Sequence, residues 1–365
     1  MKKFFFIAAI ASAALVSCTK NEVITVADQH EITFSAPVVG PQTKAQYGEI
    51  GVNYNASEHF GVYAVHTPEE LTTWAAGSLY MGTPNATGAA EGLEVLKAAG
   101  ENYWAPTAPY YWPKEGYLSF AAYSPIDVTG TVTYGATGLS VLGHTVSANT
   151  AEHVDFMYAP RVYNRQSSTE ETNDVNGAAG NKHNYEGVNI LFNHAMSSIV
   201  FKVARAKDID ATTVISLNRL TITKPCMTAD FAETITDGAT YKASPVWSNF
   251  TNNTENLVTY NVPVALTTTL KEYVNKTGEV DNDVILIPQD ITNDMDVIID
   301  YTIFTPGGHS VEQKTKIDLN ATGRPTKWEI GKRYTYNITI GLDEVIFDPA
   351  VTDWSDVDPE TDIVL

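Results

Sequence analysis

Apolar and polar side chains alternate with a period of two residues through most of this sequence. The clearest case is a run of apolar residues separated by polar ones or glycine: Tyr334, Tyr336, Ile338, Ile340 and Leu342. Residues 258–266 repeat the pattern. Successive side chains of a β-strand point to opposite faces, so the alternation predicts strands with one face on a core and the other in water. A chain made of such segments is expected to form antiparallel sheets that pack face to face.

Further strands are indicated by short segments rich in Val, Ile, Phe and Tyr. They lie at residues 32–34, 62–65, 118–123, 190–203, 284–287 and 297–304. Helical periodicity is scarce, and only residues 68–74 and 91–99 favour short helices. The sequence therefore predicts an all-β protein.

A polar stretch at residues 166–187 divides the chain into two parts. It is rich in Ser, Thr, Asn, Glu and Gly and has almost no large aliphatic side chain. This composition is typical of a linker, and the length of the chain fits two domains. We expect one β-sandwich at residues 31–165 and a second, with a tail, at residues 188–365. A long hairpin loop inside one domain is the alternative interpretation.

The first residues carry the pattern of an export signal. A positive start is followed by an apolar run at residues 4–16, which is too short to span a bilayer because that takes roughly 20 apolar residues. The run ends in Leu15-Val-Ser-Cys18, which resembles a lipobox. We expect residues 1–17 to be removed as a lipoprotein signal peptide, Cys18 to carry acyl chains such as palmitate, and residues 18–30 to form a tether. An ordinary signal peptide with a nearby cysteine is the alternative.

Charge and cysteine content limit the partners and the cross-links of the chain. The formal net charge is −20, which argues against nucleic acid and against docking on anionic lipid through a basic patch. The sequence has two cysteines, and lipidation of Cys18 would leave Cys226 without a partner for an intramolecular disulfide. The core must then be stabilised by burial alone.

The sequence contains no short motif of a known catalytic or cofactor-binding site. It has no G-x-S-x-G, no Walker A loop, no H-E-x-x-H and no G-x-G-x-x-G, and its eight His residues lack metal-ligand spacing. We therefore expect no enzyme activity, no cofactor and no metal site. Trp104 and Trp112 lie in an aromatic cluster that could stack on a glycan, although such residues more often fill the core and the strand edges of a β-domain.

Several short motifs follow one another along the chain. They are Thr43-Lys-Ala45, Phe60-Gly-Val-Tyr-Ala64, Tyr110-Tyr-Trp-Pro113, Asp155-Phe-Met-Tyr-Ala159, Ile190-Leu-Phe-Asn-His-Ala-Met-Ser-Ser-Ile199, Leu286-Ile-Pro-Gln289, Trp328-Glu-Ile-Gly-Lys-Arg-Tyr-Thr-Tyr336 and Val351-Thr-Asp-Trp354. In this order they resemble the Mfa-like and FimA-like fimbrillins, the subunits of type V pili of Gram-negative anaerobes. The resemblance covers nearly the whole chain after the export signal.

The resemblance implies two tandem transthyretin-like antiparallel β-sandwich domains and a structural or adhesive pilus subunit at the outer membrane and cell surface. Its partners would be other subunits, joined by β-strand addition, and a host protein or glycan. In stalk subunits of the family a protease cuts after a basic residue that follows the first strand. Here that position is Lys44, followed by Ala45, and no Arg precedes Arg161, so an Arg-specific protease has no site there.

The C-terminal tail is the candidate donor of the added strand. Its apolar residues include Val351, Trp354, Ile363, Val364 and Leu365. An ordinary terminal strand that completes its own domain is the alternative. A monomeric surface lipoprotein of the same fold that binds a glycan or host protein is the alternative function.

Overall fold

The computed structural model shows a protein built almost entirely of β-strands. It describes residues 26–35, 37–39, 52–54, 59–70, 77–84, 90–101, 103–135, 138–166, 187–235, 243–251, 254–273 and 283–354. Within these segments every regular element is a strand except the 3-10 turn η2 (Thr150–Glu152). The predicted all-β fold class is confirmed, and the transthyretin-like detail stays a prediction. The same segments contain no helix that is long and apolar enough to cross a membrane.

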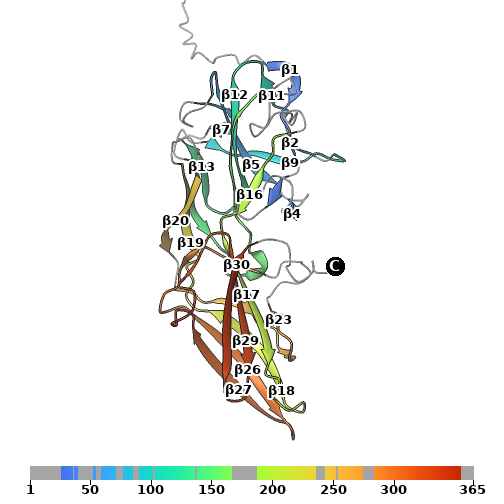
Figure 1. The fold of residues 1–365 in the computed structure, drawn as a ribbon, viewed down its shortest axis with the longest axis vertical. Coiled ribbons are helices and arrows are strands. Elements are labelled where there is room, and N and C mark those ends of the chain that lie inside the picture. Colours follow the sequence, from blue (N-terminus) through green and yellow to red (C-terminus); the bar gives the residue numbers. More distant parts are fainter. Residues whose placement is uncertain are drawn as a thin grey trace, which may run out of the picture.

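Strands between residues 34 and 194, most of them in the first half of the chain, form a large, mostly antiparallel sheet at one end of the elongated molecule (Figure 1). Its strands are, in spatial order, β2 (Phe34–Ser35), β10 (Tyr103–Pro106), β9 (Leu93–Lys97), β5 (Phe60–Thr67), β12 (Tyr117–Ser124), β15 (Met157–Arg165), β16 (Leu191–His194), β3 (Val38–Val39) and β4 (Val52–Asn53). In addition β6 (Ser78–Met81) pairs with β5, and β1 (Val26–Glu31) pairs with β11 (Tyr111–Pro113).

A second sheet combines strands from both halves of the sequence. Its order is β20 (Ala243–Thr251), β19 (Thr228–Ile235), β14 (Gly138–Thr145), β13 (Thr131–Gly135), β8 (Ala90–Glu91) and β7 (Thr83–Pro84). The hairpin of β19 and β20 pairs with β14, so it extends a sheet that begins in the first half of the chain. The predicted linker at 166–187 lies outside the described residues, and the division into domains stays a prediction.

The other end of the molecule holds two further five-stranded sheets and one short pair of strands. One sheet contains β23 (Lys271–Glu272), β17 (Ser197–Arg205), β29 (Lys332–Ile340) and β30 (Val345–Asp353), with β24 (Val284–Leu286) on β17. The other contains β21 (Leu257–Tyr260), β18 (Val214–Ile222), β26 (Asp296–Thr305) and β27 (His309–Asp318), with β22 (Val264–Ala265) on β18. The short pair is β25 (Gln289–Asp290) and β28 (Lys327–Trp328).

Two clusters of buried side chains form the core, and the strand β5 contributes to both. Phe60, Val62 and Ala64 belong to the cluster enclosed by the large first sheet. Tyr63 and Val65, which point the opposite way, belong to the cluster that continues through the second sheet to the other end of the molecule. Because both faces of β5 are buried, its sequence is almost continuously apolar rather than alternating.

Two segments differ from their predicted structure. Residues 91–99, expected to be a helix, contain the strand β9, because Val95 is fully buried there and the strand pairs with β5 and β10 on its two edges. Residues 258–266, expected to be one strand, form β21 and β22 with an interruption at residues 261–263, the last of which is Pro263. Proline has no N–H to donate to a neighbouring strand, so it interrupts the pairing with β18.

His144 makes the stability of this fold depend on pH. Its ring is buried between Phe156 and Trp247, with ring centroids 5.8 and 5.5 Å away. Burial lowers the pKa of His144, although a hydrogen bond with Thr129 opposes the shift. His144 is therefore protonated more readily in the unfolded chain than in the folded one. The free energy of unfolding decreases as the pH falls below about 6.5, the usual pKa of histidine.

We expect His144→Phe to show a smaller fall in unfolding free energy between pH 7.5 and 5.5 than the parent protein. Urea denaturation at each pH measures this difference. An unaltered pH slope in His144→Phe would contradict the assignment.

Candidate functional site: the slot filled by the N-terminal segment

Residues 26–39, which we call the closing segment, complete the first sheet. On one side β2 pairs antiparallel with β10, with Phe34 opposite Trp104. On the other side Phe34 forms a parallel bridge with Val188, and β3 continues parallel to β16. The N–H of Ser35 donates to the carbonyl of Val188 (3.1 Å), and the N–H of Val188 donates to the carbonyl of Thr33 (2.8 Å). The closing segment thus occupies a slot between β10 and residues 188–192 and joins the two ends of the sheet into a ring.

The side chains of the closing segment also fill the core inside this ring. Phe34 has no exposed surface, and Ile32 is 1% exposed. The ring of Phe34 meets Phe60 and Phe120 edge to face, with centroids 5.6 and 5.9 Å apart. Edge-to-face contacts are favourable for aromatic rings beyond the area they bury. Phe34 is therefore the main apolar anchor of the segment.

The local sequence explains why this segment is extended with one face buried. Ile32 and Phe34 are two residues apart and point into the core, whereas Thr33 and Ser35 between and after them are only half-buried. The hydroxyl of Ser35 donates to Oδ1 of Asn189 (2.6 Å), on the far side of the slot. Before Ile32 the chain continues as β1 along β11, and the N–H of Ile32 donates to the carbonyl of Tyr110 (2.7 Å).

The candidate cleavage and lipidation residues lie outside the described part of the chain. These are Cys18, Lys44 and Ala45, and the same holds for Ile363, Val364 and Leu365 of the candidate donor tail. The remaining two tail candidates lie within the described residues. Val351 belongs to β30 and pairs with Tyr334 of β29, and Trp354 follows directly after β30.

Trp354 fixes the end of β30 to the middle of the molecule. Its ring stacks on the imidazole of His194, with centroids 3.9 Å apart and planes 8° from parallel. The backbone N–H of Trp354 donates to the carbonyl of Gly331 (3.0 Å). Nδ1 of His194 lies 2.6 Å from a carboxylate oxygen of Asp155, which fixes the orientation of the ring. His194 ends β16, the same strand that borders the slot, so the slot and the C-terminal contact share one element.

The two candidate sugar-stacking residues are both part of the core. Trp112 has no exposed surface and packs against Phe120, while Trp104 is 4% exposed and has the ammonium of Lys97 5.7 Å from its ring centroid. In this conformation neither ring offers a face to a glycan. Trp104 contributes instead to β10, one border of the slot.

Sequence reasoning missed a buried polar cluster in which several of the family-like motifs meet. Arg333 donates to the buried carboxylate of Asp283 (2.8 Å), which also accepts a hydrogen bond from Ser198. Beside it, Ser197 donates to the carbonyl of Glu329 (2.7 Å). The motifs around residues 190–199 and 328–336 therefore position β17 against β29, which is a structural role.

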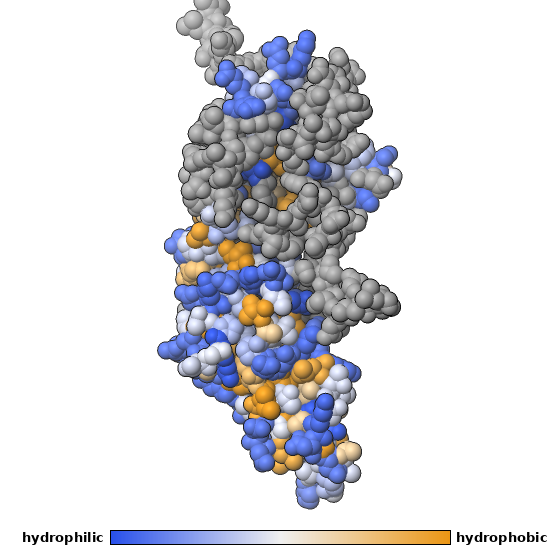
Figure 2. Space-filling view, in the orientation of Figure 1, coloured by the Kyte–Doolittle hydropathy of each residue, from blue (hydrophilic) through white to orange (hydrophobic). Residues whose placement is uncertain are grey.

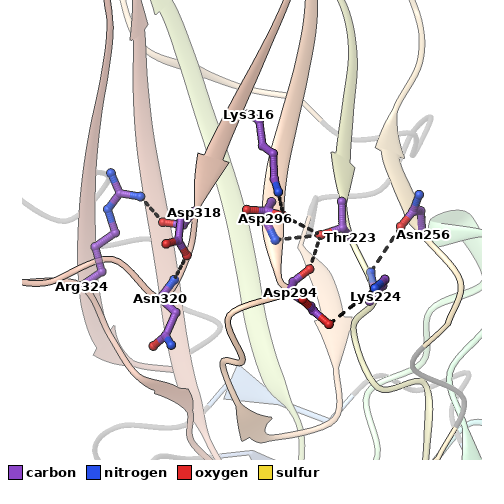
Figure 3. A network of polar contacts seen from close by, with 9 residues as sticks. All are labelled: Thr223, Lys224, Asn256, Asp294, Asp296, Lys316, Asp318, Asn320 and Arg324. Atoms are coloured by element: carbon purple, nitrogen blue, oxygen red, sulfur yellow. Dashed lines mark hydrogen bonds and ion pairs between the residues drawn. The ribbon is translucent and has the colours of Figure 1, made fainter.

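A second polar network lies at one end of the C-terminal sheets (Figure 3). The buried carboxylate of Asp296 accepts a bond from Lys316 (2.8 Å), and the hydroxyl of Thr223 donates to the carbonyl of Asp294 (2.8 Å). The pKa of Lys316 is raised by its hydrogen bond to Asp296. The network joins β18 to β26, and among the described residues no group of three or more His, Cys, Asp and Glu side chains could hold a metal ion.

The fold and the slot define an all-β protein whose first sheet is completed by one short segment from near its N-terminus. In a comparison with models of known families, the model described as fimbrillin-like matches residues 43–354. The chain therefore belongs to the fimbrillin-like family. The match begins after the closing segment and ends at Trp354.

The chain is also similar to solved structures of bacterial fimbrial and adhesion proteins. A fimbrial protein from Bacteroides vulgatus is 13% identical, with a TM-score of 0.59 over 88% of this chain and 100% of that one. A candidate cell adhesion protein from Bacteroides uniformis is 16% identical, with a TM-score of 0.49 over 89% and 100%. The fimbrial anchor protein Mfa2 from Porphyromonas gingivalis is 11% identical, with a TM-score of 0.27 over 89% and 98%. No curated protein matches the sequence.

Replacing Phe34 should weaken the whole first sheet. We expect Phe34→Ala to lower the free energy of unfolding by about 3–5 kcal/mol, because it removes a fully buried ring from a packed aromatic cluster. Chemical denaturation followed by tryptophan fluorescence measures the loss. The matched control is the adjacent Thr33→Ala, whose side chain is half-buried and should cost far less. Equal losses at the two positions would show that Phe34 is not the anchor.

Proposed function

We propose that the protein is a subunit of a cell-surface pilus, and that it assembles when its slot loses the closing segment and accepts an extended segment from a neighbouring subunit. The observation that carries this proposal is the position of the closing segment, which pairs with β10 on one side and with residues 188–192 on the other. Membership of the fimbrillin-like family and the similarity in fold to a fimbrial protein support the pilus role. A structural subunit needs no active site, and none is proposed.

If the closing segment leaves, a slot refilled by another strand is more stable than a slot left without one. Without it, backbone N–H and C=O groups of β10 and of residues 188–192 lose their partners, and the pocket around Phe60 and Phe120 is opened to water. Burying one large apolar side chain stabilises the folded protein by about 1.5–3 kcal/mol. The slot buries at least two such side chains, Ile32 and Phe34. A donated strand would supply both the backbone partners and the apolar side chains.

Release of the closing segment is proposed to follow a cut between Lys44 and Ala45. Such a cut would separate residues 26–39 from the rest of the first sheet. The family match, which begins at residue 43, supports a boundary at this place. Because no Arg precedes Arg161, the protease must accept lysine.

The donated segment is proposed to come from the C-terminal part of the chain, where Val351 and Trp354 lead into a tail ending in Ile363, Val364 and Leu365. The transthyretin-like sandwiches expected from the family would give each subunit one slot and one donor, which is the arrangement needed for a linear fibre. Retention of the tail as an ordinary terminal strand would instead suit a subunit at the end of a fibre.

One observation favours a second candidate function, a monomeric surface lipoprotein that binds a glycan or host protein. The segment before Arg161 has no arginine, so a protease that requires arginine would leave the closing segment in place. The slot would then stay filled. Binding would have to use surface loops, because Trp104 and Trp112 are buried.

Trimming after Lys44 should decide between the two functions. We expect brief trypsin treatment to convert purified monomer into a ladder of SDS-resistant oligomers, because cleaved subunits can exchange strands. Gel electrophoresis and size exclusion chromatography measure the change. Lys44→Gln is the matched control and should remain monomeric under the same treatment. A cleaved protein that stays monomeric would support the lone lipoprotein.

Export as a lipoprotein to the outer membrane is a separate part of the proposal, carried by the lipobox that ends in Cys18. We expect cells grown with labelled palmitate to incorporate the label into the parent protein and not into Cys18→Ala, because attachment of the lipid begins at the Cys18 thiol. Cys226→Ala is the control and should remain labelled. Label in Cys18→Ala would contradict lipidation at this residue.

A further inference from the structure

A hollow lies on the sheet that contains β18, β26 and β27, which is at the other end of the molecule from the slot in Figure 1. Its volume is about 570 Å³, within the range of about 300–1,000 Å³ that is typical of small-molecule sites. Every residue around it carries a polar or charged side-chain group. By contrast, apolar spots interrupt the hydrophilic surface on the face of this end that Figure 2 shows. Most small-molecule sites are lined mainly by apolar groups, so this hollow fits a polar ligand.

The hollow is formed where the sheet is irregular on both edges of β18. The pairing with β26 shifts register between Leu217 and Arg219, which makes Asn218 a β-bulge. On the other edge the partner of β18 changes from β21 to β22, and residues 261–263 between those strands belong to neither. A bulge bends its strand and redirects a side chain, and bulges are common next to functional sites. The connection at residues 261–263 therefore borders the hollow together with the bulge.

A row of three charged side chains crosses the strands on one side of the hollow. Arg219 is paired with Asp300, and Asp300 is paired with Lys314, so the three side chains lie on the same face of the sheet. Nε of Arg219 donates to one carboxylate oxygen of Asp300 (2.9 Å), and the ammonium of Lys314 lies 3.8 Å from the other oxygen. A guanidinium has five N–H donors, and this pair uses one of them. The side chains of Arg219 and Lys314 are 53% and 64% exposed, so both cations are accessible to a ligand.

A second row of polar side chains lies on the same face, two residues further along β26. Thr302 is paired with Glu312, and the side-chain amide of Asn218 donates to the hydroxyl of Thr302 (2.8 Å). This bond turns the bulged residue toward the hollow and leaves its amide oxygen as an acceptor. Glu312 is exposed and adds a carboxylate. The second row thus supplies acceptors opposite the donors of the first.

The next charged pair along β27 shows what a purely structural pair looks like in this sheet. The carboxylate of Asp296 is 4% exposed and is covered by Lys316 at 2.8 Å (Figure 3). The carboxylate of Asp300 is 19% exposed, and the two cations beside it leave it partly open. The row at Asp300 therefore faces a space that a ligand can enter, whereas the pair at Asp296 is closed.

The charges around the hollow select the class of ligand. The two positive charges of Arg219 and Lys314 balance the two negative charges of Asp300 and Glu312. A hollow without net charge suits neither phosphate groups, which need cations, nor a metal ion, which needs several oxygen ligands of its own. A hydroxyl group both donates and accepts hydrogen bonds, so neighbouring hydroxyls match donors and acceptors that alternate at short distance. Neutral sugars carry such hydroxyls on adjacent carbon atoms.

We propose that this hollow binds a neutral oligosaccharide. Arg219 and Lys314 donate to its hydroxyls, and Glu312 and the amide oxygen of Asn218 accept from them. The site lies on a sheet that takes no part in filling the slot, so the inference is independent of strand exchange. It adds adhesion to a sugar to the proposed role of the protein as a pilus subunit.

A glycan array tests the class of ligand. Purified, uncleaved mature protein is applied to neutral oligosaccharides of hexoses and N-acetylhexosamines, printed beside their sialylated and sulfated forms. We expect binding to neutral members that added negative charge does not strengthen, because the hollow has no excess of cations. Absence of binding to every neutral member, or binding to the acidic forms alone, would overturn the proposal.

Variants test the position of the site, with the best neutral oligosaccharide of the array as the probe. We expect Lys314→Ala and Glu312→Ala each to raise the Kd about tenfold or more, because each removes a charged hydrogen-bonding group. Isothermal titration calorimetry measures the Kd. Lys327→Ala is the matched control and should bind like the parent, since Lys327 is also an exposed lysine in an ion pair, 2.9 Å from Glu329, but lies outside the hollow.

Both substituted residues are exposed, so the variants are expected to fold, and equal midpoints of urea denaturation check this. A parent-like Kd in both Lys314→Ala and Glu312→Ala would place the sugar elsewhere and overturn the assignment. Because the uncleaved monomer is used throughout, neither result depends on whether subunits exchange strands.

Discussion

A buried backbone N–H or C=O group without a partner costs about 1–3 kcal/mol, and this constraint governs the first half of the molecule. The closing segment satisfies such groups on two sides at once, because it pairs antiparallel with β10 and parallel with residues 188–192. The aromatic pocket around Phe34 depends on the same segment. Backbone pairing and core packing are therefore lost or restored together, so the slot is stable only when some extended strand fills it.

The two ends of the molecule are connected by buried contacts as well as by the chain. The N–H of Ile285 donates to Nδ1 of His153 (3.0 Å), and the indole of Trp247 donates to the carbonyl of Ala195 (2.7 Å). The side chain of Gln289 accepts from the N–H of Cys226 (2.6 Å), which fixes the chain between β18 and β19. These contacts connect the two ends of the molecule through hydrogen bonds between sheets, rather than through a single linker.

The sequence predicted the class of fold and much of the element order because alternation reports directly on which faces are buried. The strand β29 alternates between buried and half-buried residues over its length, as expected for residues 334–340. Prediction failed where tertiary context outweighed local pattern: residues 91–99 are held as β9 by neighbours on both edges, and Pro263 splits a segment whose apolar pattern continues through it. The pairing between β14 and β19 could not be predicted, because the alternation within a strand does not indicate which distant strand lies beside it. The same holds for the stack of His194 on Trp354, which joins residues 160 positions apart in the chain.

The proposed strand exchange would need no large external source of free energy, because β30 (residues 344–352, EVIFDPAVT) resembles the closing segment (residues 31–39, EITFSAPVV) in sequence. The proposed donor and the segment that it would replace offer nearly the same groups, an inward pair of a β-branched residue and Phe followed by a proline and Val, so bonds broken in one place would be remade in another. The balance then depends on small differences. Phe347, which is half-buried in the edge strand, would gain burial in an enclosed aromatic pocket, whereas the stack of Trp354 on His194 would oppose its departure. Because His194 ends the strand that borders the slot, filling the slot and holding the C-terminal strand act on one element, β16, and the state of one end of a subunit is physically linked to the state of the other.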